Sequence, residues 1–371
     1  MHTRNSVESR PGRGRSPVST GVHAGAVGVA AAAWLLAGGQ TAAPVHKGLT
    51  AVDGLEVGHF TLSARPTGCT VVLAVDGAVG GADVRGGAPG TRETDVLDPV
   101  NTVDVVHAVV LSGGSAFGLA AADGVVRYLT EKGIGYDTRV AKVPIVPAAI
   151  LFDLGVGDAS VRPTADCGYR AAQAADDGPV VEGDVGAGAG ATVGKLGGRG
   201  RAMKAGVGSA SITLPNGLVV AALAAVNAVG DIIDPKTGAV VAGLRSEDGT
   251  GFADARLLLR SGATLRPEPG QNTTLAVVAT NATLTKVEAT KVAQMSHDGF
   301  ARAIVPVHTP ADGDAVFALA TGRHRTNGRD LLTIGALAAD VTAQAIVRAA
   351  ERSEGLAEYP SVRMLRETPP R

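Results

Sequence analysis

Short β-branched runs alternate with longer helical patterns from residue 48 to about residue 356. Continuous apolar runs are typical of buried strands, whereas apolar residues recurring every three or four positions are typical of helices. The first pattern predicts strands at residues 70–75, 103–111, 209–214, 218–226, 273–280 and 315–321. The second predicts helices at residues 115–130, 165–175 and 334–350, and a helix that carries Val287, Val292, Met295 and Phe300. No repeat of fixed period occurs, so we expect one layered α/β domain over residues 48–371.

Local signals mark where several of these elements begin. Thr285 and Glu288 form a capping box, which predicts a helix start at this point. Asn216 and Gly217 lie between two predicted strands, and this pair is a hairpin signal. Residues 243–271 are the most polar stretch of the interior and run directly into the strand at 273–280. A flexible connector is therefore expected to enter a core strand.

Residues 1–47 differ in character from the rest of the chain. The first 15 residues contain four arginines, and an Ala/Val/Leu-rich run at residues 24–37 is followed by small residues at 40–43. This order resembles a secretory signal, which favours export. A basic, glycine-rich extension of a cytoplasmic protein is the alternative. The apolar run is shorter than the ~18 residues of a membrane span, and we expect no other segment to form one.

Composition narrows the partners and the kinds of site. The 34 basic and 35 acidic residues nearly cancel, and no basic block is interleaved with aromatics, so nucleic acid is not an expected partner. Aromatics make up 3% of the chain, which has 51 glycines, so small aliphatic side chains must build the core. Cys69 and Cys167 lack the spacing of a zinc or redox site. We expect them to be small core residues, with a disulfide as the alternative.

The glycine-rich stretch at residues 183–208 invites two cofactor interpretations. Residues 186–191 (GAGAGA) match the form of a dinucleotide fingerprint, but no good strand leads into them and no acidic residue follows ~20 positions later. A phosphate loop is excluded because Leu196 stands where Ser or Thr must bind magnesium. We therefore expect no cofactor and no metal, but an active-site wall from which Lys195 projects.

Ser115 lies in a predicted strand-to-helix turn, where some hydrolases have their nucleophile. The nucleophile elbow requires Gly two residues after the serine, and this position is Phe117. Ser115 is therefore expected to cap the following helix. Ser115, His308 and Asp312 could in principle form a triad, although nothing in the sequence indicates that they meet.

Asn272-Thr273-Thr274 lies where the polar connector meets a strand. A threonine hydroxyl at such a junction can attack the preceding carbonyl, and water then hydrolyses the resulting ester. The freed α-amine, with a pKa near ~7.7–8.0, can act as general base for the hydroxyl of its own residue, so that no histidine is needed. By itself the motif is weak evidence, because it also matches a glycosylation acceptor or an ordinary strand start.

Nine motifs, in their order and spacing, resemble the DmpA family. They are residues 68–70 (GCT), 83–88 (DVRGGA), 89–94 (PGTRET), 111–119 (LSGGSAFGL), 143–147 (VPIVP), 162–164 (RPT), 272–274 (NTT), 297–302 (HDGFAR) and 308–314 (HTPADGD). This family contains aminopeptidases that accept D- and β-amino acids, and nylon-oligomer hydrolases. The resemblance implies an αββα sandwich, similar to N-terminal-nucleophile hydrolases with different strand connections. It also implies one chain that splits into two subunits that stay together.

The resemblance implies roles for individual residues. Thr273 corresponds to the nucleophile, so the cut would fall between residues 272 and 273. Asn227 corresponds to an asparagine that helps to hold the oxyanion, and Lys195 to a glycine-loop lysine near the nucleophile. Asp312 and Asp314 correspond to the pair that contacts the new amine; carboxylates there would raise the pKa of the amine unless burial opposes them.

One position departs from the family. Phe152 stands where well-known members have a tyrosine near the substrate, which leaves the substrate open; Phe152 and Ser115 are the candidates for the substrate pocket. The expected protein is a homo-oligomer of cleaved subunit pairs that hydrolyses short peptides or related amides. The alternatives are a self-cleaving acyltransferase of the ornithine acetyltransferase type and an uncleaved protein that binds a small molecule.

Overall fold

The computed structural model describes residues 46–262, 271–325 and 330–367. The predicted leader at residues 1–47 lies outside this part of the chain, except for its last two residues. Residues 263–270 of the predicted connector (residues 243–271) also lie outside it. The leader therefore stays a prediction.

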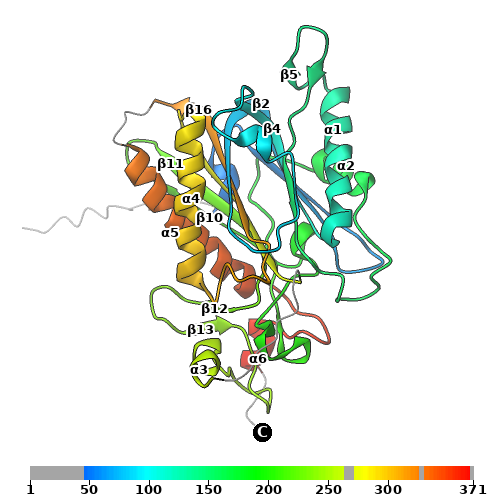
Figure 1. Ribbon diagram of the computed structural model, residues 1–371, viewed down its shortest axis with the longest axis vertical. Coiled ribbons are helices and arrows are strands. Elements are labelled where there is room, and N and C mark those ends of the chain that lie inside the picture. Colours follow the sequence, from blue (N-terminus) through cyan, green and yellow to red (C-terminus); the bar gives the residue numbers. More distant parts are fainter. Residues whose placement is uncertain (1–45, 263–270, 326–329, 368–371) are drawn as a thin grey trace, which may run out of the picture. The chain divides into compact units, whose positions relative to one another are not determined.

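Nine strands of the described chain form one mixed sheet at the centre of the molecule (Figure 1). In spatial order they are β10 (Val207–Thr213), β11 (Val219–Asn227), β14 (Thr273–Ala282), β16 (Ala315–His324), β2 (Gly68–Val84), β4 (Val105–Ser112), β7 (Ala148–Ile150) and β3 (Thr91–Arg92), with β1 (Glu56–Thr61) paired to β2 beside this path. β14 pairs with β16 in parallel, as β4 does with β7, and the other pairs are antiparallel. All six strands predicted from the sequence are present, although β2 is much longer than residues 70–75.

The sheet makes two layers because β2 has 17 residues and belongs to both halves. Leu223, Val277 and Leu319, from β11, β14 and β16, share one buried cluster with Val72 and Val109, from β2 and β4. This cluster is the core between the two halves of the sheet. Burying such aliphatic side chains on both sides stabilises each layer by the hydrophobic effect, at about 25 cal/mol per Å² of apolar surface.

Pairs of helices cover the two outer faces (Figure 1). α4 (Lys286–Ala303) and α5 (Asp330–Glu351) pack on β10, β11 and the C-terminal end of β2. α1 (Ala121–Glu131) and α2 (Ala165–Gln173) pack on β1, β4 and the N-terminal end of β2. The order helix, sheet, sheet, helix is the αββα sandwich that the family resemblance implied. Two short helices, α3 (Ala255–Arg260) and α6 (Val362–Glu367), lie outside these layers.

The capping box predicts the start of α4 correctly. Thr285 Oγ1 accepts the Glu288 N–H at 3.3 Å, and the Glu288 carboxylate accepts the Thr285 N–H at 2.8 Å. Val292 and Phe300 are buried against the sheet, as their spacing predicts. Val287 also lies on this helix, but its side chain is 64% exposed. It lies in the first turn, next to the buried Lys286, which takes the inward position there.

Residues 115–130 do not form one helix. Ser115–Ala120 is a 3-10 turn, and α1 begins at Ala121. The residue before the turn, Gly114, has the left-handed conformation, and the Ser115 side chain makes no capping hydrogen bond. The prediction that Ser115 caps the helix is therefore wrong. The adjacent Gly113 serves packing, because a Cβ there would lie 2.2 Å from the Asp153 carboxylate.

Short strands form smaller sheets outside the main one. They are β12 (Asp231–Ile233), β13 (Val240–Ala242) and β15 (Ile304–Val305) in one, β5 (Tyr136–Asp137) and β6 (Lys142–Val143) in a second, and β8 (Thr192–Val193) and β9 (Met203–Lys204) in a third. β8 and β9 lie in the glycine-rich stretch. One 3-10 turn precedes β8, and two more lie between β8 and β9. The stretch is thus built from tight turns, without the strand-to-helix unit of a nucleotide site.

The two cysteines form a disulfide. Cys69, at the start of β2, is bonded to Cys167 in α2, and their Cα atoms are 6.0 Å apart. Both are buried, as expected of core residues. The pairing was the less favoured alternative, because two cysteines 98 residues apart give no sequence signal of contact.

α5 is long and apolar enough to cross a membrane by length and composition, which corrects the expectation that no other segment comes close. No other helix in the described ranges meets that test. Half of its apolar window is buried, and Ile334, Val341 and Ile346 lie in the core beneath the sheet. Its apolar character is therefore explained by the sandwich.

Candidate active site

The parallel pairing of β14 and β16 brings the two halves of the candidate site together. Leu275 is paired with Ala315, and the same offset of 40 residues continues backwards as an isolated bridge between Asn272 and Asp312. One step further along, the Thr274 N–H donates to Asp314 Oδ1 at 2.6 Å. The DGD segment therefore lies alongside the NTT segment because the two strands start together.

The carbonyl of Asn272 is held by two donors. The Thr273 hydroxyl donates to the Asn272 oxygen, and the Gly313 N–H donates to the same oxygen at 2.9 Å. Both Asn272 and Thr273 are 2% exposed. A Cβ on Gly313 would lie 2.7 Å from Thr273 Oγ1, so only glycine fits between the two aspartates. No sequence pattern marks a backbone amide as a donor, and the glycine within the DGD motif is the only local signal of this one.

The segment at residues 83–88 supports the DGD segment from the other side. The N–H groups of Arg85 and Gly86 donate to the Asp314 carbonyl at 3.0 and 3.2 Å, and the Ala88 N–H donates to the Asp312 carbonyl at 2.8 Å. A Cβ on Gly86 would lie 2.4 Å from that Asp312 oxygen. The DVRGGA motif thus positions the residues that immediately precede β16 rather than contributing reactive groups.

The two aspartates have different surroundings. Asp312 accepts from the Thr309 N–H at 3.0 Å and from the Val229 N–H at 3.4 Å. Its burial and the neighbouring Asp314 carboxylate raise the pKa of Asp312 to about 6. Asp314 accepts from Thr274 and from the His308 ring, whose Nδ1 lies 2.8 Å from Asp314 Oδ2. Both carboxylates are almost fully buried.

A chain of imidazoles runs outward from Asp314. His308 Nε2 lies 3.2 Å from His297 Nδ1, and His297 Nε2 lies 3.1 Å from the Asp83 carbonyl oxygen. Burial lowers the pKa of His297 to about 4, so this ring is neutral at neutral pH. These contacts account for the two histidine motifs and explain why neither ring is free to serve Ser115.

The hypothetical triad does not form. His308 is bonded to Asp314 and His297, Asp312 is bonded to Thr309, and the Ser115 N–H donates to the Leu151 carbonyl at 3.0 Å. No hydrogen bond within the described ranges joins Ser115 to His308. Both Ser115 and His308 have positive φ angles, of 56° and 54°.

Asn227 and Lys195 lie on the other side of the Asn272–Thr273 peptide bond. Asn227 is the register partner of Thr273 between β11 and β14. The Lys195 ammonium, carried on a 3-10 turn (Lys195–Gly197), donates to Asn227 Oδ1 at 2.9 Å and to the Asn227 carbonyl at 3.0 Å. The Asn227 side-chain nitrogen donates to the Phe152 carbonyl at 2.8 Å, and not to Asn272. The backbone donor to the Asn272 carbonyl is therefore Gly313, beside the Thr273 hydroxyl.

The pKa of Lys195 is lowered to about 7, chiefly by burial and to a smaller extent by the nearby Arg199, whereas Asp312 and Asp153 act in the opposite direction. An amine with a pKa near neutrality can accept and return a proton at physiological pH. Burial of Lys195 thus lowers its pKa into the range in which it can exchange a proton at neutral pH.

A small pocket opens beside this lysine. It is lined by Phe152, Asp153, Gly155, Val156, Thr192, Lys195, Arg199, Gln271 and Tyr359. Phe152 lines this pocket, whereas Ser115 contacts Leu151 and does not line it. The loop that carries Phe152 is held by an ion pair of Arg65 with Asp153, whose side chains are both 0% exposed.

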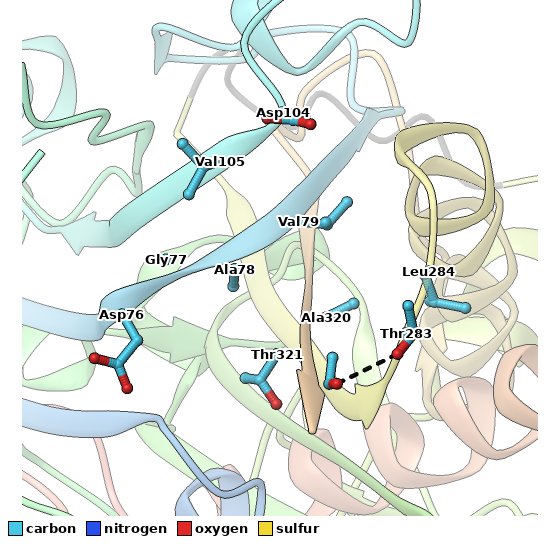
Figure 2. A pocket seen from close by; sticks show the side chains of 11 residues that line it. Asp76, Gly77, Ala78, Val79, Asp104, Val105, Thr283, Leu284, Ala320 and Thr321 are labelled. Carbon is cyan, nitrogen blue, oxygen red and sulfur yellow. Dashed lines mark hydrogen bonds between the residues drawn. The ribbon is translucent and has the colours of Figure 1, made fainter. Parts of the chain in front are cut away.

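A separate hollow lies at the opposite ends of the same strands (Figure 2). It is lined by β2 residues around Ala78 and by Thr283 and Ala320, and the Thr283 hydroxyl donates to the Gly322 carbonyl at 3.3 Å. Because β14 has ten residues at ~3.3 Å each, roughly 30 Å separate this hollow from Thr273. Within the described residues no cluster of three or more His, Cys, Asp or Glu could hold a metal ion.

A model of peptidase family S58 matches residues 47–360. The chain belongs to peptidase family S58. An uncharacterized aminopeptidase of Mycobacterium leprae is 43% identical over 357 residues, which cover 86% of this chain and 94% of the relative. A 6-aminohexanoate-oligomer endohydrolase of a Kocuria species is 30% identical over 310 residues, which cover 80% and 84%.

A solved structure supports the fold of this S58 family member. The L-aminopeptidase D-Ala-esterase/amidase of Ochrobactrum anthropi, described as a variant of the N-terminal-nucleophile hydrolase fold, superposes with a TM-score of 0.63 at 19% identity. The match covers 85% of this chain and 90% of that one. The predicted family and fold are confirmed, and the chain is a hydrolase of peptide or amide bonds.

Proposed function

We propose that the chain cleaves itself between Asn272 and Thr273 and then uses Thr273 to hydrolyse short peptides or related amides. One observation carries the proposal: the Thr273 hydroxyl lies on the Asn272 carbonyl, whose oxygen is already polarised by the Gly313 N–H at 2.9 Å. A backbone amide aimed at a carbonyl that becomes tetrahedral stabilises the developing negative charge.

In the first reaction, Thr273 Oγ1 attacks the Asn272 carbonyl carbon and gives up its proton. The carbon–nitrogen bond then breaks, the nitrogen of Thr273 takes up a proton, and an ester joins Asn272 to Thr273 Oγ1. Water hydrolyses this ester, which leaves a carboxylate on Asn272 and a free α-amine on Thr273. Lys195 is the base that we assign to the first proton transfer, because its pKa of about 7 leaves a fraction of it neutral at neutral pH, and its contact with Asn227, the register partner of Thr273, places it beside the start of β14.

In the second reaction, the same hydroxyl attacks a substrate amide. The α-amine of Thr273 takes the hydroxyl proton and passes it to the leaving amine, and water then hydrolyses the acyl ester. Asp314 holds the adjacent Thr274 N–H and so orients the new terminus. Asn227 is the side-chain donor that we assign to the substrate oxyanion, which requires its amide to leave the Phe152 carbonyl.

Related proteins support the substrate class. One relative is named as an aminopeptidase and another as an oligomer endohydrolase acting on 6-aminohexanoate units, which are linked by amides. We infer that this chain acts on amide bonds of small, flexible substrates. We further propose that cleaved subunit pairs assemble into a homo-oligomer, and that residues 1–47 direct export. Light scattering and an intact-mass spectrum of the native protein test these two points.

Replacement of the nucleophile tests the central proposal. Thr273→Ala should leave one full-length band on a denaturing gel and no amidase activity. Thr274→Ala is the matched control, because the Thr274 hydroxyl is buried and has no hydrogen-bond partner among the described residues. The control should still give two bands, with Thr273 as the first residue of the smaller one by N-terminal sequencing. Two such bands from Thr273→Ala would refute the assignment.

A further inference from the structure

Two cations hold the residue that precedes the scissile pair. Lys195 Nζ donates to the Gln271 backbone carbonyl at 3.4 Å, and the Arg199 guanidinium donates to the Gln271 side-chain oxygen. Gln271 therefore lies in the small pocket beside Lys195, with its amide oxygen directed at Arg199. The chain's own residues 271 and 272 occupy the acyl side of the site, as an intramolecular substrate does.

The place of Arg199 is built into the pocket. A Cβ on Gly155 would lie 1.0 Å from an Arg199 guanidinium nitrogen, so only glycine at this position leaves room for the side chain. The guanidinium also lies 5.6 Å from the centre of the Phe152 ring. Such a contact with an aromatic face orients the planar group without neutralising it.

Arg199 has no acidic partner in the described part of the chain, since its contacts there are a neutral amide and an aromatic ring. The carboxylate that shares the pocket, Asp153, is already engaged. Asp153 accepts from Arg65 at 2.7 Å, from the Gly114 N–H at 2.8 Å and from the Thr67 hydroxyl at 2.6 Å. A partly buried arginine with only neutral partners can bind a planar carboxylate or amide in two-pronged fashion.

We propose that Arg199 determines specificity by binding a carboxylate or carboxamide on the acyl side of the substrate, at the second residue before the cut. This rests on the proposed function, because the same Thr273 hydroxyl attacks the Asn272 carbonyl first and the substrate carbonyl later. The acyl part of the substrate must then lie where residues 271 and 272 lie. The preferred substrates are amides with a Glu-like or Gln-like group at that position, and a cationic group there is disfavoured by both Lys195 and Arg199.

Four acetylated dipeptide p-nitroanilides, acetyl-X-Asn-p-nitroanilide with X as Glu, Gln, Leu or Lys, test the proposal in the purified cleaved protein. Asn-p-nitroanilide, which lacks the residue at X, reports turnover without the subsite. We expect kcat/KM for X = Glu to exceed that for X = Leu by about tenfold, the range for a charge-assisted hydrogen bond, and X = Lys to be the poorest substrate.

Arg199→Gln should bring the Glu-to-Leu ratio close to one. The ratio is compared within one protein, so a general loss of activity or of folded protein cancels. Arg201→Gln is the matched control, because Arg201 bonds to the Arg245 carbonyl and does not line the pocket; its ratio should equal that of the wild type. A wild-type ratio of one, or a ratio that survives in Arg199→Gln, overturns the proposal.

Binding separates this proposal from the function on which it rests. Calorimetry with acetyl-Glu-Asn and acetyl-Leu-Asn should show the same preference in the cleaved protein, and the loss of it in Arg199→Gln, even where no anilide is hydrolysed. Equal binding of the two peptides contradicts the subsite alone. An intact, inactive chain contradicts self-cleavage, and the subsite with it.

Discussion

At the scale of single residues, the sequence shows which functional groups are available at the site, but it does not show how deeply they are buried or what they contact. A threonine hydroxyl such as that of Thr273 is a weak nucleophile by itself, and exposed aspartates are ordinarily ionised. Their behaviour here comes from burial, which raises the pKa of Asp312 to about 6, and from the placement of one peptide N–H on the Asn272 carbonyl.

Gly313→Ala should slow self-cleavage by about 100-fold, the loss seen when one oxyanion donor is removed. The added Cβ would meet Thr273 Oγ1 at 2.7 Å and displace the N–H from the Asn272 carbonyl. A time course of band conversion on denaturing gels measures the rate. Gly200→Ala is the control, because no atom lies within 4 Å of a Cβ there. Cleavage of folded Gly313→Ala at the wild-type rate would rule out this amide as the oxyanion donor.

Because Lys195 is buried, the free energy of unfolding should increase as the pH rises from about 7 to 10. Burial lowers its folded-state pKa from 10.5 to about 7, so between these values the unfolded chain binds more protons and stability rises with pH. Below pH 7 the full cost of burying the charge is present. The test compares the Thr273→Ala protein with the Thr273→Ala, Lys195→Met double variant, so that neither chain is cleaved.

From pH 7 to pH 10, the Tm of the Thr273→Ala protein should rise by several degrees more than that of the Lys195→Met double variant, since ~1 kcal/mol moves Tm by about 2–4 °C. Differential scanning calorimetry gives the two curves. Lys236→Met, at an exposed lysine, should follow the single variant. Parallel curves for Lys195→Met and its parent would show that the buried ammonium does not titrate in this range.

At the scale of elements, register decides what meets. β14 and β16 are ordinary β-branched strands in sequence, and the motifs before each of them meet because the two pair in parallel with an offset of 40 residues. The capping box of α4 was predictable because it is a contact between residues three apart. The disulfide between β2 and α2 was not, because nothing local relates Cys69 to Cys167.

Reduction of that disulfide should lower stability by about 2–5 kcal/mol, because the bond closes a loop of 98 residues in the unfolded chain. Thermal unfolding with and without a reductant measures the change. The Cys69→Ala, Cys167→Ala double variant should unfold at the lower temperature in both conditions. Two free thiols in the native protein, together with an unchanged Tm after reduction, would contradict the bond. A bond that persists in the purified protein favours the export that we propose.

At the scale of the whole molecule, two sheet layers bury the start of β14 while its preceding segment reaches the pocket beside Lys195. Asn272 and Thr273 are both 2% exposed, yet the residue before them lines a pocket. The proposed self-cleavage therefore needs the complete sandwich, since Lys195 and Gly313, which donates to the Asn272 carbonyl, are 118 residues apart in the chain.

The assignment of Thr273, Lys195, Asn227 and the two aspartates to the catalytic site stays a prediction from the family resemblance. The sequence by itself determined most of the periodic elements and, through nine ordered motifs, the family. These follow from local patterns, which a chain displays before it folds. Only the tertiary structure decided that Gly313 polarises Asn272, that Ser115 neither caps a helix nor meets His308, and that Val287 faces water. Each of these depends on contacts between distant segments, whose geometry is determined by packing and not by the order of residues.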